Sequence, residues 1–209
     1  MKRTLIFSIA TLLLAAAMLS QSADDLRSVR ADMMGALTGD IERFERGMRT
    51  VEALLEKNPK DPAILVLHGN GMMVRAGEGF RKGDMANAAK AWQSGLDEMA
   101  QAVELAPKSL LVRARRGVFM LTASRQTPPQ MGMSLLELGV ADFEKVLEIR
   151  DREKSFAAGS LHKRGELLTG LADGWNRMGN TEKTRAYFER VLKDMQGTVY
   201  EQKARALHG

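Results

Sequence analysis

The chain has 209 residues, with 31 Lys and Arg against 26 Asp and Glu, and it contains no cysteine. The absence of cysteine excludes disulfides, thiol nucleophiles and a lipid-modified cysteine anchor. The positive excess is small and forms no dense basic stripe, so the composition argues against nucleic-acid binding.

The N-terminus is typical of an export signal. Lys2 and Arg3 precede a mostly apolar run from Leu5 to Leu19, and Ser20-Gln21-Ser22 places small residues at the −3 and −1 positions of a cleavage site. We therefore predict a signal peptide over residues 1–22 and a mature domain over 23–209. An uncleaved signal anchor is the alternative, although the apolar run is short for a membrane span.

The expected location follows from this signal and from the lack of cysteine. Secreted eukaryotic domains often depend on disulfides, so a cysteine-free exported chain favours a bacterial periplasmic or secreted protein. After cleavage we expect no membrane span. Without Lys2 and Arg3, the excess of basic over acidic residues falls to three.

The mature sequence predicts helices almost throughout. Its five prolines, at positions 59, 62, 107, 128 and 129, all fall where a helix should begin or end. Aromatic residues are sparse, which argues against strands. Apolar residues recur at helical spacing, as in Ile41, Phe44, Met48 and Val51. The predicted fold class is all-α.

The sequence also repeats itself at an interval of 48 residues. Pro59 and Pro107 end two predicted helices, and Gly69 and Gly117 follow them at the same offset, with a third copy of the step at Gly165. Turns with the sequences Gly39-Asp40, Gly83-Asp84 and Gly179-Asn180 should open the second helix of each pair.

Several glycines fall inside predicted helices, where each costs about 1 kcal/mol relative to alanine. They are Gly47, Gly69, Gly95, Gly117 and Gly139. This cost is reasonable where a missing side chain lets two helices cross closely, so we expect helix crossings at these positions.

These features resemble the tetratricopeptide repeat (TPR) family. With Pro107 at the proline that ends the family's unit, Gly95 and Ala102 occupy positions where the family has small residues, and Met99 occupies a large one. The units are longer than the usual 34 residues or so, through insertions near 76–84 and 122–135. The resemblance implies a TPR-like solenoid of about three antiparallel helix pairs, whose first helices line a concave surface.

No catalytic constellation can be assembled from the sequence. The three histidines, His68, His162 and His208, lack the i, i+4 spacing of a zinc hydrolase. The chain has no nucleophile elbow, Walker loop or dinucleotide fingerprint. We therefore predict a protein that is not an enzyme and that has no cofactor and no metal site.

The candidate partner-binding residues are Arg113, Arg116, Met120 and Trp92. Arg113 and Arg116 share one helix face with Met120 and could bind a carboxylate or an acidic peptide in a bidentate manner. The alternative is a solvated face or an internal ion pair with Glu78, Glu98 or Glu104. Trp92, in a long helix expected from about Met85 to Leu105, is either a packing residue or a ligand platform.

The architecture and the missing catalytic groups together predict a binding protein. The leading hypothesis is a non-catalytic protein-binding scaffold of the bacterial envelope, with a protein or peptide partner. The alternative is a small-ligand-binding helical accessory protein of a solute transport system, with a pocket near Trp92 and Met72. The sequence leaves the partner's identity and the oligomeric state open.

Overall fold

The structure is a computed structural model that describes residues 28–33, 35 and 39–208. These residues are helical almost throughout and contain no strand, which confirms the predicted all-α class. The helices are α3 (Ile41–Lys57), α4 (Pro62–Lys82), α5 (Met85–Leu105), α6 (Leu110–Ala123), α7 (Pro129–Arg152), α8 (Leu161–Arg177), α9 (Thr181–Asp194) and α10 (Val199–His208). The predicted signal peptide and its cleavage site lie outside the described residues.

The chain divides between Ala102 and Val103 into two compact units. Unit 1 contains α3, α4 and most of α5, preceded by helical residues at 28–33 and 35. Unit 2 contains the end of α5 and the helices α6 to α10. Across the part of the chain that the structure describes, no helix is both long and apolar enough to cross a membrane.

The helix boundaries follow the predicted turn residues. Gly39, Gly83 and Gly179 adopt positive φ angles of 75°, 82° and 74°, a conformation that glycine reaches without steric cost. The side chain of Asp40 caps α3 by accepting a hydrogen bond from the backbone amide of Arg43 at 3.0 Å. All five prolines precede or follow a helix or occupy its first position, as predicted.

The predicted insertions differ from expectation, because most of their residues lengthen helices. Residues 76–82 form the last turns of α4, and α7 already begins at Pro129, so the turns are confined to 83–84 and 124–128. Residues 76–82 include the good helix formers Ala76, Glu78, Arg81 and Lys82, and a proline is well suited to the first turn of a helix. Ile41, expected on the buried face of α3, is 46 % exposed because it is the helix's first residue.

The helical glycines lie at helix crossings, as their spacing predicted. A Cβ atom on Gly69 of α4 would come within 2.7 Å of the Gly95 carbonyl oxygen in α5, and one on Gly95 would come within 2.6 Å of the Gly69 carbonyl. In unit 2, a Cβ on Gly117 of α6 would lie 2.6 Å from the ring of Phe143 in α7. Contacts this short admit no side chain, so the glycines permit the close pairing of α4 with α5 and of α6 with α7.

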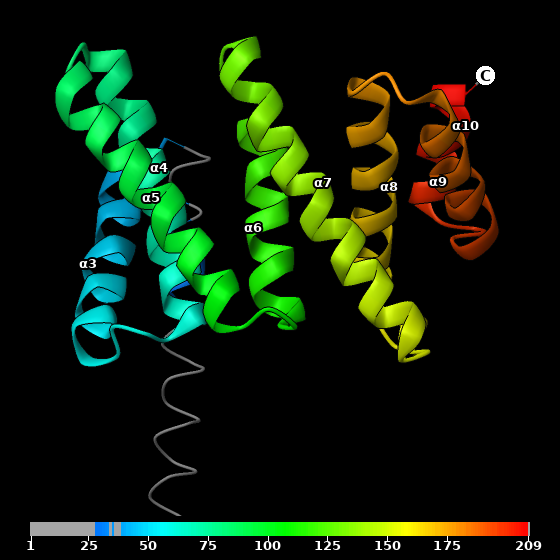
Figure 1. The fold of residues 1–209 in the computed structure, drawn as a ribbon, viewed down its shortest axis with the longest axis horizontal. Helices are drawn as coiled ribbons and strands as arrows, with labels where there is room; N and C mark the ends of the chain where they lie inside the picture. Colours follow the sequence, from blue (N-terminus) through cyan, green and yellow to red (C-terminus); the bar gives the residue numbers. More distant parts are fainter. Residues whose placement is uncertain (1–27, 34, 36–38, 209) are drawn as a thin grey trace, which may run out of the picture. The chain divides into compact units, whose positions relative to one another are not determined.

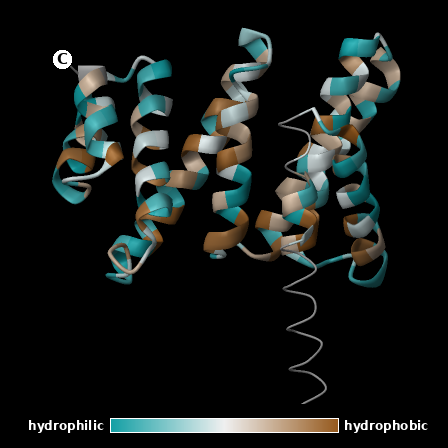
Figure 2. Cartoon of the chain, turned by 180° about the vertical axis from the view of Figure 1, so that it is seen from behind, coloured by the Kyte–Doolittle hydropathy of each residue, from teal (hydrophilic) through white to brown (hydrophobic). Residues whose placement is uncertain are grey.

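Unit 2 is a row of helices in chain order, with one continuous core. Helix α7 packs between α6 and α8, α8 packs on α9, and α10 covers the end formed by α8 and α9 (Figure 1). Leu136, Leu168 and Leu171 are fully buried between these helices. The helices carry both apolar and hydrophilic residues, so each presents one side to its neighbours and another to solvent (Figure 2). This is the helix-pair packing of a TPR-like repeat.

Candidate functional site

The two arginines predicted to bind a partner converge on a buried aspartate. Arg113 Nη1 donates to Asp142 Oδ1 at 2.8 Å, while Arg116 donates through Nε to Oδ2 at 2.5 Å and through Nη2 to Oδ1 at 3.0 Å. Asp142 belongs to α7 and is completely buried, and the two arginine side chains are only 15 % and 12 % exposed. The internal partner is therefore Asp142 and none of the three glutamates considered from the sequence. This cluster ties α6 to α7.

The other two predicted residues take part in packing. Met120 of α6 is 1 % exposed and is a buried core residue. The ring of Trp92 in α5 packs edge-on against Phe80 of α4, with the ring centroids 6.4 Å apart. The structure thus brings Arg113 and Arg116 together on Asp142, while Met120 is buried and Trp92 belongs to unit 1.

A second polar cluster joins α7, α8 and α9. Glu144 Oε1 in α7 accepts hydrogen bonds from Trp175 Nε1 at 3.1 Å, Lys183 Nζ at 3.0 Å and the Tyr187 hydroxyl at 3.2 Å. The Lys183 ammonium also lies 3.7 Å from the centroid of the Trp175 ring, a cation–π contact. One carboxylate therefore fixes side chains from two neighbouring helices.

This environment changes the acidity of Tyr187. Burial of the phenol, followed by the negative charge of Glu144 and the hydrogen bond to it, raises the Tyr187 pKa to about 12. Burial and the nearby negative charge both disfavour the phenolate. Tyr187 therefore stays a neutral hydrogen-bond donor to Glu144 at physiological pH.

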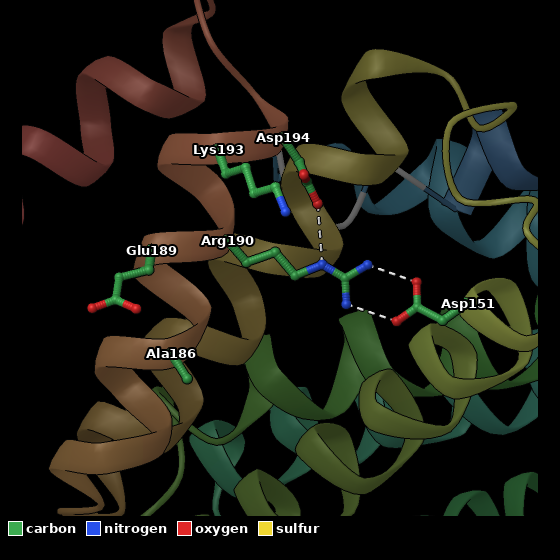
Figure 3. Close-up of a pocket in the computed structure, with 6 residues that line it drawn as sticks. All are labelled: Asp151, Ala186, Glu189, Arg190, Lys193 and Asp194. Carbon is green, nitrogen blue, oxygen red and sulfur yellow. Dashed lines mark hydrogen bonds and ion pairs between the residues drawn. The ribbon is translucent and has the colours of Figure 1, made fainter.

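A shallow depression lies further along α7 and α9 (Figure 3). Arg190 of α9 reaches across to Asp151 of α7, where its two terminal nitrogens donate to the carboxylate at 2.6 and 2.7 Å, and its Nε donates to Asp194 at 3.1 Å. The hydrogen bonds to Asp151 raise the pKa of the Arg190 guanidinium. The depression has a volume of about 430 Å³, and Ala186, Glu189 and Lys193 complete its lining.

The lining of the depression offers both fixed and free charges. Arg190 is held from two sides, so its guanidinium has a defined position. Glu189 points away from Arg190 (Figure 3), and both Glu189 and Lys193 are exposed. Neither has a hydrogen-bond or ion-pair partner among the residues that the structure describes. We call the surface formed by the Glu144 cluster and this depression the α7–α9 face.

Sequence reasoning missed the α7–α9 face, although a signal for it exists. Glu144 and Asp151 are seven residues apart on α7, and their partners Lys183 and Arg190 are seven residues apart on α9. Seven residues are close to two helical turns, so each pair of positions falls on one side of its helix. Matching acidic and basic positions at this interval indicate two helices linked by ion pairs. Among the described residues, no group of three or more His, Asp or Glu side chains could hold a metal ion.

Comparison with solved structures finds a likeness to another helical protein. The crystal structure of a thermophilic TPR protein from Thermus thermophilus is 15 % identical in sequence, and the alignment covers 87 % of this chain and 97 % of that one with a TM-score of 0.38. No protein-family model matches the chain, and no curated protein matches it. The TPR-like description therefore rests on the helix pairs and their glycine crossings.

Proposed function

We propose that the chain is a non-catalytic, protein-binding scaffold of the bacterial envelope, and that it contacts its partner through the α7–α9 face. The observation that supports this most directly is the depression at Arg190. There, a guanidinium fixed by two carboxylates lies beside exposed Glu189 and Lys193, which have no partner among the described residues.

Such an arrangement suits protein recognition for a physical reason. A side chain that is already held in place loses little rotamer freedom on binding, so the entropic cost of association is lower. Free charges at the rim add electrostatic complementarity and increase the association rate. Ala186, a small exposed residue that also lines the depression, leaves room for a partner's side chain.

The envelope location is part of the proposal and depends on the N-terminal sequence. Its basis is the short basic start, the apolar run and the small residues before Ala23.

Site-specific photocross-linking in native cells tests the proposal. A photoreactive amino acid replaces Ala186 inside the depression, and the matched control carries it in place of Arg49, an exposed residue of α3 in unit 1. We expect a discrete adduct with one partner protein from position 186 and a much weaker one from position 49.

A charge-swapped variant sharpens this experiment. Glu189→Lys combined with Lys193→Glu reverses the pattern of free charge while leaving the net charge unchanged, so it should reduce the adduct from position 186. Equal adducts from both positions, or an adduct insensitive to the swap, would show that the α7–α9 face is not the partner site.

A further inference from the structure

The first turn of α8 carries two basic side chains. It contains Lys163 and Arg164 and no acidic residue, immediately after the Ser160 cap. The N-terminus of a helix has a partial positive charge of its own, so cations there are unfavourable unless an anion lies nearby. The same backbone amides and dipole make this end of a helix suited to binding an anion.

Arg164 lacks an acceptor for one of its donors. Its Nε atom is buried and has no hydrogen-bond partner among the described residues. The guanidinium carbon lies 5.9 Å from the centroid of the Phe156 ring, which gives a cation–π contact but satisfies no N–H group. A buried N–H without an acceptor is destabilising, and such groups are rare in native proteins. Arg164 as a whole is only partly buried, so a change of its side-chain rotamer would bring this N–H to an acceptor outside the chain and remove the cost.

Arg150 lies beside Arg164 and also has no carboxylate partner within the described part of the chain. Its Nη1 donates to the Ser155 carbonyl oxygen, at 3.3 Å. Both arginines border Gly159: the position of a Cβ on that glycine would be 3.3 Å from Arg164 Cγ and 3.7 Å from Arg150 Nη1. The missing side chain of Gly159 therefore leaves space that two guanidinium-bearing side chains share.

The contrast with Arg190 is informative. Its guanidinium also lies over Phe156, 4.8 Å from the ring centroid, but it is neutralised by Asp151 and Asp194. Phe156 thus contacts two arginines. Arg190 is paired with carboxylates of this chain, whereas the buried Nε of Arg164 has no acceptor among the described residues. Phe156 also joins this region to the depression of the α7–α9 face, which Arg190 lines.

We propose that Arg150 and Arg164 bind the carboxylate of an acidic side chain in the partner's docked segment, a proposal that rests on the proposed function and names the chemistry of the partner. A carboxylate can accept two parallel hydrogen bonds from one guanidinium and further bonds from a second. The exposed cations Lys163 and Lys193 add positive charge to α8 and α9, the helices that carry Arg164 and Arg190. The segment recognised is therefore an acidic peptide lying across Phe156.

A defined peptide tests this without knowledge of the partner. The probe is a fluorescent, terminally blocked peptide of alternating glutamate and glycine, and its binding is followed by fluorescence anisotropy at low salt. Arg150→Gln and Arg164→Gln should each weaken binding by about tenfold, the effect of one charge-assisted hydrogen bond. Arg49→Gln removes the same charge from α3 and should change the affinity by less than about twofold. Circular dichroism checks that each variant keeps its helix content.

Two further comparisons separate a built site from general attraction. Gly159→Ala leaves every charge in place but puts a methyl group 3.2 Å from the Phe156 carbonyl oxygen and 3.3 Å from Arg164 Cγ, so it should also weaken binding. The same peptide with glutamine for glutamate should not bind. Equal losses in Arg49→Gln and Arg164→Gln, or equal binding of the glutamine peptide, would overturn the proposal. If the photocross-link from position 186 persists while the glutamate peptide does not bind, this inference fails and the proposed function stands.

Discussion

The buried Asp142 cluster gives a sharp test of how unit 2 is held together. Asp142 is completely buried and accepts three hydrogen bonds, one from the guanidinium of Arg113 and two from that of Arg116. Arg116→Met keeps much of the aliphatic volume but removes both bonds, leaving a buried carboxylate with one donor. Breaking a buried pair from one side costs about 3 to 5 kcal/mol. Because Arg113 remains, we expect a loss of about 3 kcal/mol in the free energy of unfolding.

Urea unfolding followed by circular dichroism measures this loss, provided that the dependence on urea concentration is unchanged between variants. Arg125→Met is the control. Arg125 forms an ion pair with Asp173, and the two side chains are 53 % and 36 % exposed, so this pair should contribute less than about 1 kcal/mol to the free energy of unfolding. The triple variant Arg113→Met, Arg116→Met, Asp142→Leu removes all the charges together, so it should recover most of the stability lost in the single variant. A stability of Arg116→Met within about 0.5 kcal/mol of wild type would refute this account, since that is the range of ordinary surface changes.

Three other predictions follow from individual residues. Gly69→Ala should lower the free energy of unfolding by about 1 to 3 kcal/mol, because its methyl group meets a backbone carbonyl of α5 at 2.7 Å. Gly77→Ala in the same helix puts a methyl group where nothing lies within 4 Å, so urea unfolding should show a gain of up to about 1 kcal/mol in the same quantity. In a Tyr200→Phe background, ultraviolet absorbance should show Tyr187 ionising near pH 12. Because the pKa of Tyr187 in the folded protein lies above the unfolded value of about 10, ionisation of this residue leaves the free energy of unfolding unchanged below pH 10 and lowers it as the pH rises from 10 to 12. Intact mass spectrometry of the exported protein should show a chain that begins at Ala23, and retention of residues 1–22 would instead support a signal anchor.

The fold was largely predictable because its determinants are local. A glycine that ends a helix, a capping Asp or Asn and a proline at a helix terminus each act through the backbone of a few adjacent residues. Gly83 and Asp84 therefore indicated the start of α5, and the structure begins that helix at Met85. Gly69 and Gly95 are less local, but they were detectable because glycine is costly in a helix unless another helix approaches closely.

The site was less predictable because it depends on which distant side chains meet. Arg113 and Arg116 were recognised as a pair on one helix face, yet nothing near them in sequence indicates that Asp142, in the next helix, supplies the carboxylate. The insertion near 122–135 was expected to separate two elements, whereas much of it became the first turns of α7. Which residues of α7 face α6 depends on the register between the two helices, and that register is a property of packing between them.

The arginines of unit 2 include two pairs that differ in what neutralises them. Arg116 and Arg190 are bound by carboxylates of the same chain, so their charge is used in holding helices together. Arg150 and Arg164 lie against the segment that joins α7 to α8, have no carboxylate partner among the described residues, and include a buried donor without an acceptor there. In a well-packed protein, an unsatisfied buried donor is retained only where something outside the chain satisfies it or where its cost is offset elsewhere. Phe156 contacts one arginine of each pair, Arg164 and Arg190. On this reasoning, the helix-pair scaffold and its binding chemistry are separable, and substitutions at Arg150 or Arg164 should change recognition while leaving the fold intact.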